Sequence, residues 1–203
     1  QVGDGADLEA VALGDGDEAV AGGDGDGIVG DVYGASFVSN TMDPCWSEMN
    51  KPFDSCDHGT RMSSVIGARG NNNRQLAGVV WSCKMIAVKV FGLFSGPTSD
   101  MIQGMEYAYK RGSRLMNCSW TIRITATDIP ALRQYFSATT DVLYVFGAAN
   151  DNANLDQVPH DPDCQGGHWY PQEFANSNLI VVGASDSSDK KWNLNLTPQC
   201  GWG

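Results

Sequence analysis

His58 stands in the stretch DHGTRMSSVIG, where an aspartate precedes it and a glycine and a threonine follow it. The small and apolar residues beyond it are typical of a helix that begins near the histidine. Because imidazole titrates near neutral pH, one interpretation of His58 is a general base. The alternative is a solvated histidine in a turn. The other two histidines, His160 and His168, lack such surroundings and are interpreted as loop residues.

Four short apolar runs rich in valine and isoleucine predict buried strands. They span residues 84–91, 114–120, 141–149 and 178–185. Strands that alternate with helices predict an α/β fold, with a mostly parallel central sheet and helices on both faces in three layers. Ligands bind beyond the carboxyl ends of the strands of such sheets. We therefore expect functional side chains near residues 91–98, 119–123 and 147–154, and at the start of the helix after His58.

Two helical patterns lie between these runs. In residues 98–112, Thr98 or Ser99 is the expected N-cap and Gly112 the expected end. The apolar face of this helix holds Met101, Met105 and Ala108. The second helix starts at Asp128 with a proline in its first turn, and its apolar positions are Leu132, Tyr135 and Phe136.

The bulk composition predicts one domain over residues 1–203. Residues 1–31 are an acidic region rich in glycine and aspartate, interpreted as loop, and residues 32–203 are the α/β core. The net charge of −11 with scattered basic residues argues against a nucleic-acid partner. No apolar run reaches the roughly 18 residues of a membrane span.

The six cysteines form no CxxC pair, which argues against a zinc cluster. Cys83 and Cys118 have apolar neighbours and are interpreted as core thiols. The remaining four, Cys45, Cys56, Cys164 and Cys200, lie in polar stretches where disulfides are plausible. Cys45 and Cys56 are close enough in sequence for a disulfide between them to close a short ring. Their presence favours an extracellular or secretory location.

Four stretches, in order, resemble the subtilisin-like serine peptidases, or subtilases. DHGTRMSSVIG resembles the family's HGTHVAG, AGVVWSCKMIAVKVFG its GVAPxAxLxAVKVLG, YVFGAANDN its VAAAGNxG, and YPQEFANSNLIVVGASDSSDKK its YPAxxxxVIxVGAxD. Upstream, GGDGDGIVGDVYGASFV is similar to an insert of some members. The resemblance covers nearly the whole chain and implies a monomeric endopeptidase acting on polypeptides.

By this resemblance His58 is the general base, and Asn150 donates its side-chain amide to the oxyanion. The alternative for Asn150 is an Asn-Asp turn after a strand. Residues Ser119, Trp120 and Thr121 occupy the segment that binds the substrate backbone. The resemblance implies that His58 and Asn150 face the same cleft.

Other family features have no counterpart in these residues. The nucleophile motif GTSMATP and the aspartate-bearing strand are both missing, so we expect the middle of a peptidase domain, incomplete at both ends and inactive alone. Ser99 fits a helix start better than a nucleophile. Three residues after the histidine differ from the family motif, namely Arg61, Ser63 and Ser64. In the later motifs, Thr121 and Ala149 stand in place of glycines. A β-branched residue at 121 is expected to crowd an extended peptide.

The loop GNNNRQLAG occupies the place where many subtilases hold structural calcium. The resemblance implies the Asn72 side chain and the carbonyls of Arg74 and Leu76 as ligands, and a polar turn is the alternative. The acidic loop with Asp24, Asp26 and Asp31 fails known calcium patterns and is interpreted as solvated. Two other functions stay open, a non-catalytic peptide-binding or scaffold module and an acidic calcium-binding domain.

Overall fold

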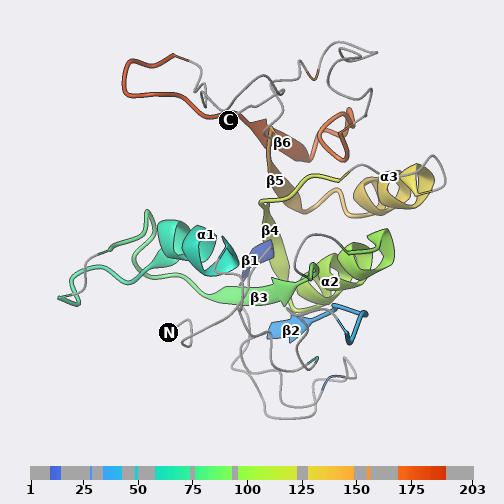
Figure 1. Cartoon of the computed structure of the whole chain (residues 1–203), viewed down its shortest axis with the longest axis horizontal. Coiled ribbons are helices and arrows are strands. Elements are labelled where there is room, and N and C mark those ends of the chain that lie inside the picture. The colour runs from blue at the N-terminus through green and yellow to red at the C-terminus, as the bar shows by residue number, and fades with distance from the viewer. Residues whose placement is uncertain are drawn as a thin grey trace. The chain divides into compact units, whose positions relative to one another are not determined.

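The computed structural model describes residues 10–14, 28, 34–42, 49, 58–73, 76–92, 96–122, 128–148, 155 and 169–190 (Figure 1). The chain divides into two compact units, residues 1–117 and 118–203. The division falls at the end of the strand formed by residues 113–118.

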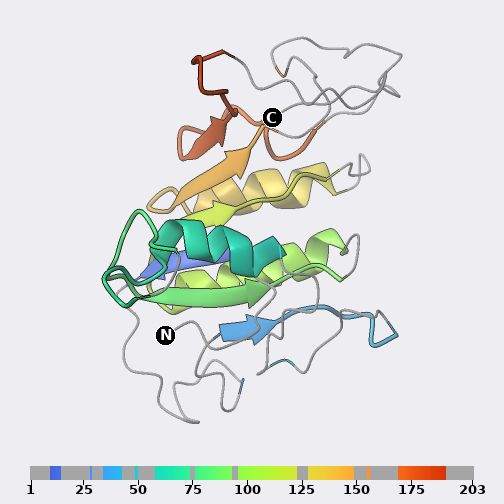
Figure 2. The same ribbon diagram turned by 60° about the vertical axis from the view of Figure 1, so that its left-hand side comes forward.

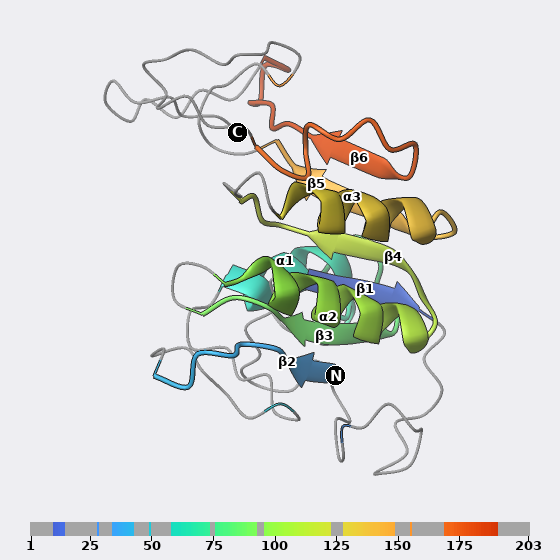
Figure 3. The same cartoon turned by 90° about the vertical axis from the view of Figure 1, so that its right-hand side faces the viewer.

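The first unit has a sheet with helices on both faces. Its strands run in the order β2, β3, β1, β4, with the bounds β1 Ala10–Gly14, β2 Gly34–Ser36, β3 Met85–Lys89 and β4 Ser113–Cys118. β2 is parallel to β3. Helix α1 (His58–Gly67) lies on one face and α2 (Thr98–Lys110) on the other (Figures 2 and 3). The predicted α/β class and its three layers are confirmed within this unit.

Strand β1 corrects the interpretation of residues 1–31 as loop throughout. Residues 10–14, AVALG, pair antiparallel with β3, with Ala10 opposite Val88 and Leu13 opposite Met85. The run is too short to show a period of its own. Pairing with a neighbouring strand, which satisfies its backbone groups, decides its structure instead.

Helix α2 packs closely on β3 through Gly104. A Cβ atom on Gly104 would lie 2.4 Å from Cγ1 of Val90 and 2.8 Å from Cγ1 of Val88. The predicted apolar face is confirmed, because Met101, Met105 and Ala108 are all buried. Side chains alternate across a strand, so the intervening Lys89, fully buried, points to the opposite face of the sheet.

The predicted N-cap of α2 is wrong. Pro97 occupies the cap with an extended backbone, and no side-chain cap bond forms. Proline's restricted φ, here −67°, suits this position, so neither Thr98 nor Ser99 is needed there. The predicted end is confirmed, because Gly112 adopts a φ of +84° and its N–H donates to the Tyr109 carbonyl.

Asp100 joins the first turn of α2 to the chain that leaves β2. Its side chain is 3 % exposed, and its Oδ2 accepts bonds from the Ser39 N–H at 3.0 Å and the Ser39 hydroxyl at 2.8 Å. A carboxylate in the first turn also interacts favourably with the helix dipole. The two bonds hold segments that are distant in sequence.

The second unit is built on a parallel pair of strands, β5 (Leu143–Gly147) and β6 (Leu179–Val182). Helix α3 (Ile129–Ala138) packs on them through Phe136, whose ring meets those of Tyr144 and Phe146 edge to face. Of the predicted apolar positions, Leu132 and Phe136 are buried and Tyr135 is half-buried. Asp128 occupies the predicted N-cap without a side-chain cap bond.

A buried hydroxyl pair closes this core. The hydroxyls of Thr139 and Tyr144 lie 2.8 Å apart. Burial raises the pKa of Tyr144 to about 12, although its hydrogen bond to Thr139 acts in the opposite direction. The neutral phenol is therefore the form that the fold requires.

We predict that Asp100→Ala lowers the free energy of unfolding by about 2 kcal/mol, because both donors of Ser39 lose a charged acceptor. Ser39→Ala removes only the hydroxyl donor and should lower it by about 1 kcal/mol. Urea unfolding of the two variants and the double variant measures both losses. Fully additive losses would show that the two residues are not coupled.

We predict that stability falls between about pH 10 and pH 12, because the unfolded chain then loses the Tyr144 proton that the folded chain retains. Tyr144→Phe removes this contribution, so its free energy of unfolding should decline less steeply across the same window. Urea unfolding at several pH values compares the slopes. Equal slopes for the two proteins would contradict the prediction.

Candidate functional site

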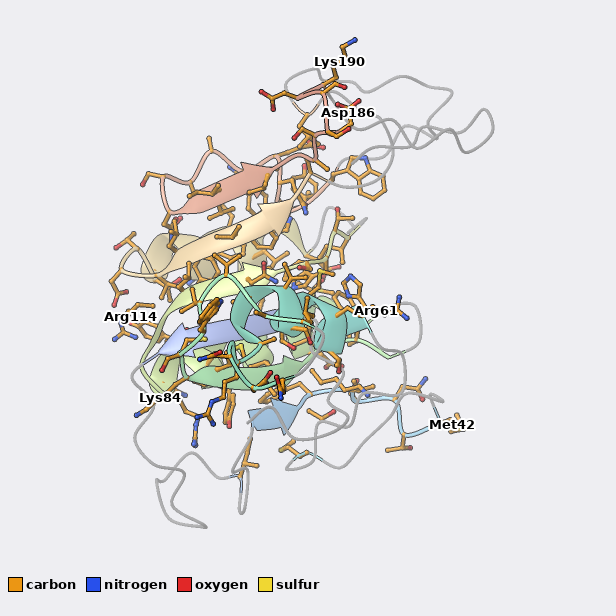
Figure 4. All side chains as sticks on the ribbon, turned by 90° about the vertical axis from the view of Figure 1, so that its left-hand side faces the viewer. Met42, Arg61, Lys84, Arg114, Asp186 and Lys190 are labelled. Atoms are coloured by element: carbon orange, nitrogen blue, oxygen red, sulfur yellow. The ribbon has the colours of Figure 1, made fainter. Side chains whose placement is uncertain are left out.

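His58 is the first residue of α1, and its side chain is exposed. The prediction that it begins a helix is confirmed. Arg61, in the same first turn, lies at one edge of the unit, whereas Lys84 and Arg114, which stand at the starts of β3 and β4, lie at the other (Figure 4). His58 therefore begins its helix at the carboxyl edge of β3, where α/β sheets bind ligands.

The two serines that replace small residues in this helix are satisfied locally. The hydroxyls of Ser63 and Ser64 both donate to the Thr60 carbonyl, at 3.0 and 2.6 Å. Ser63 is the buried one, whereas Ser64 is half-buried. Neither hydroxyl needs a partner outside α1, so each fits without an added polar contact to the sheet.

The loop after α1 is held by backbone bonds to the end of the helix. Gly78 donates to Ala68, and Val79 donates to Val65 at 3.0 Å. Between these anchors Asn71 and Asn73 adopt left-handed conformations with φ near 57° and 60°. Such residues tolerate this conformation better than most, which explains the asparagine run.

This loop fits calcium only in part. Asn72 and Leu76 are exposed, and Arg74 lies outside the described residues. Residues 68–78 carry amide and carbonyl oxygens but no carboxylate. The described residues contain no group of three or more histidine, cysteine, aspartate or glutamate side chains that could hold a metal. A calcium ion here would need an acidic ligand from another segment.

In the second unit, Gln172 fixes the segment predicted to bind substrate. Its Nε2 donates to the Trp120 carbonyl at 2.9 Å and to the Gly147 carbonyl at 3.0 Å. The hydroxyl of Thr121 lies 3.3 Å from its Oε1. Gln172 is buried, and its bond to Trp120 is shielded from water, whereas the bonds to Gly147 and Thr121 are partly buried. The family motifs did not single it out, although it lies within YPQEF.

Two further contacts hold the same segment. Ile122 and Tyr170 exchange backbone bonds of 3.1 and 3.2 Å. The buried Trp120 ring meets the Phe146 ring edge to face, with centroids 5.1 Å apart. Ser119, beside it, is half-buried. Residues 119–122 are thus fixed both by the core and by residues 170–172.

Asn150 and Ala149 lie outside the described residues, which end on this strand at Ala148. Ala148 donates to the Val182 carbonyl at 2.9 Å and so continues the pairing of β5 and β6. His58 belongs to the first unit and residues 119–121 to the second. The approach of His58 and Asn150 to one cleft stays a prediction.

The two described cysteines differ. Cys118, at the end of β4, is fully buried, as predicted for a core thiol, and burial raises its pKa. Cys83 is only half-buried, because it precedes β3 on the connecting segment, so its interpretation as a core thiol is wrong. Cys45, Cys56, Cys164 and Cys200 lie outside the described residues, and the proposed ring stays a prediction.

Comparisons with known proteins agree on one family. The model of the Subtilase family matches residues 19–197. Subtilisin-like protease 1 of Plasmodium vivax is 34% identical over 175 residues, which are 83% of this chain and 26% of that protein. Subtilisin Savinase of Lederbergia lenta is 30% identical over 159 residues, 78% of this chain and 50% of that protein. The chain thus spans half or less of these relatives.

Solved structures show the same fold. The epidermin leader peptide processing serine protease of Staphylococcus aureus superposes with a TM-score of 0.60 at 18% identity, over 77% of this chain and 42% of that one. MycP1, without its N-terminal propeptide, gives a TM-score of 0.51 at 18% identity, over 73% and 50%. The predicted subtilisin-like α/β fold is therefore confirmed.

We predict that iodoacetamide alkylates Cys83 in the folded chain at least about tenfold faster than Cys118, because only a thiolate that the reagent can reach reacts. Mass spectrometry of proteolytic peptides after a short reaction measures both sites. In denaturant the two rates should become similar. Equal rates in the folded chain would mean that Cys118 is not shielded.

Proposed function

Because this chain belongs to the subtilase family, whose members are serine proteases, we propose that residues 1–203 form the central part of a serine endopeptidase domain. The observation that supports this most is the family match over residues 19–197 together with His58 at the start of α1. The substrate would be an extended polypeptide. The reaction would be acyl transfer to a serine, followed by hydrolysis.

In this proposal His58 accepts the proton of the nucleophilic serine as its oxygen attacks the peptide carbonyl carbon. It then passes that proton to the departing amine. The Asn150 side-chain amide donates to the oxyanion that develops on the carbonyl oxygen. The backbone of residues 119–121 would align the peptide.

The nucleophilic serine and the aspartate that orients His58 would come from chain outside residues 1–203. Those residues contain no GTSxA motif, and Ser99, the superficial substitute, lies in the first turn of α2 next to Asp100. Without that serine no acyl-enzyme can form, so we propose that these residues alone are inactive. Some rate over water is compatible with an oxyanion site alone.

The surroundings of the enzyme follow from charge and family. We propose a monomer in the extracellular space or secretory pathway that binds polypeptides and no nucleic acid, consistent with the net charge of −11. None of the described helices has both the length and the apolar character needed to cross a membrane.

A non-catalytic, peptide-binding subtilase module is the second candidate. The departures from the family motif around the histidine favour it, namely Arg61, Ser63 and Ser64. The local bonds of both serine hydroxyls weaken this interpretation, because neither substitution demands a changed position of α1. Activity of the longer protein separates the two candidates.

We predict that a longer product of the same gene hydrolyses casein and reacts with a fluorophosphonate probe, whereas residues 1–203 do neither. In the longer protein His58→Ala should lower kcat by about 10⁶-fold, and Asn150→Ala by about 10² to 10³-fold. His168→Ala is the control and should leave kcat unchanged. Stoichiometric, His58-dependent labelling of residues 1–203 would reveal a nucleophile within this chain.

We further propose that the loop of Asn72, Arg74 and Leu76 binds a structural calcium ion with a carboxylate from elsewhere in the protein. Millimolar calcium should then raise the melting temperature of the longer protein, and magnesium should not. Asn72→Ala should remove the shift. If residues 24–31 bound calcium instead, the Asn72→Ala variant would keep the rise in melting temperature. If calcium does not raise the melting temperature of the parent protein, a structural calcium site is excluded.

A further inference from the structure

Gln172 and Asn178 are two buried side-chain amides of the second unit with the same bonding pattern. Each uses its nitrogen to donate to two backbone carbonyls. Gln172 joins Trp120 to Gly147, which ends β5. Asn178 joins Phe136 to Thr139 and immediately precedes β6. Because β5 and β6 are parallel, the two amides stand at opposite ends of the strand pair.

We propose that Gln172 is a positioning residue for peptide binding: it fixes the distance between residues 120–121 and Gly147 at the carboxyl ends of the strands. This inference rests on the proposed peptidase function. It concerns a side chain that contacts the binding segment at Trp120 and Thr121 and is not assigned to the reacting atoms.

The bonds of Gln172 allow only one orientation of its amide. The nitrogen has two hydrogens and faces two carbonyl oxygens, so both donors are used. The oxygen faces the Thr121 hydroxyl, which can donate to it. A flipped amide would set its oxygen against two other acceptors, so the network selects the orientation described. A rigid link of this kind leaves little freedom in the separation of the two segments.

Gly147, at one end of this link, offers an accessible backbone. Gly147 is exposed, and a Cβ built on it would have no described atom within 4 Å. Thr121 directs its hydroxyl to Gln172, so that group is held away from a peptide that approaches from solvent. An extended peptide would meet the backbone of residues 120–121 beside this exposed glycine.

Gln172→Met and Asn178→Leu form a matched pair of tests. Each keeps roughly the size of the side chain and removes a buried amide that donates to two carbonyls, so both should lower the melting temperature to a similar extent. Only Gln172→Met should weaken the binding of the peptide substrate. In the longer protein, below both melting temperatures, it should lower kcat/KM about tenfold, mainly through KM. Asn178→Leu should stay within twofold of the parent.

A second measurement does not depend on activity. In residues 1–203, Gln172→Met should speed hydrogen exchange of the Ile122 and Tyr170 amides at least about tenfold relative to the parent, because the segment loses its anchor. Asn178→Leu should leave both rates unchanged. If the methionine variant does not fold, Gln172→Asn is used, which is one methylene shorter and should lose at least one of the two bonds.

Equal changes in kcat/KM for the two variants, or unchanged exchange at Ile122 and Tyr170, would overturn the proposal. A longer parent protein that cleaves no peptide would instead overturn the proposed function. The exchange measurement would still decide whether Gln172 positions the segment.

Discussion

The burial of strand β3 on both faces is the constraint on which the first unit depends. Its four residues from Ile86 to Lys89 are almost fully buried, so each face must be covered and each edge paired. Helix α2 covers one face through Gly104, β2 pairs along one edge, and β1 along the other. Such a strand is mostly apolar, and its one buried charged residue, Lys89, requires a partner in the protein interior.

Because α1 leads into β3 through a loop that folds back on the helix, the place of β3 also sets where α1 begins. The bonds from Gly78 and Val79 to the end of α1 fix the far end of the helix. His58, at the near end, is thereby presented at the carboxyl edge of the strand. Its position is thus a consequence of sheet packing.

Continuous apolar runs were sufficient to predict four of the strands, and the helical spacing of apolar residues was sufficient to predict the buried face of α2. β3 to β6 lie within the predicted runs or one residue from them, and the buried face of α2 is as expected. β1 was missed because five residues, AVALG, show no period, and only their pairing with β3 makes them a strand. The cap at Pro97 was missed because Thr98 and Ser99 offer a stronger local signal.

The candidate site was predictable in the same uneven way. Family motifs predicted roles for His58 and residues 119–121, since these occupy fixed places in the pattern. Gln172 was not predicted, because its role depends on its side-chain amide bonding to both Trp120 and Gly147, which are distant in sequence. Hydrogen bonds between distant segments leave no periodic trace in a sequence.

The antiparallel pairing of β1 with β3 has a consequence for how the chain folds. Ala10 must find Val88, and Ser39 must find Asp100, which lies 61 positions away. In the second unit Phe136 packs on Tyr144 after a short turn, and β5 pairs with β6 across a shorter interval. Loop-closure entropy rises with the length of chain enclosed, by about 0.6 kcal/mol for each doubling. Pairing β1 with β3 therefore closes a longer loop than pairing β5 with β6, and it costs more loop-closure entropy.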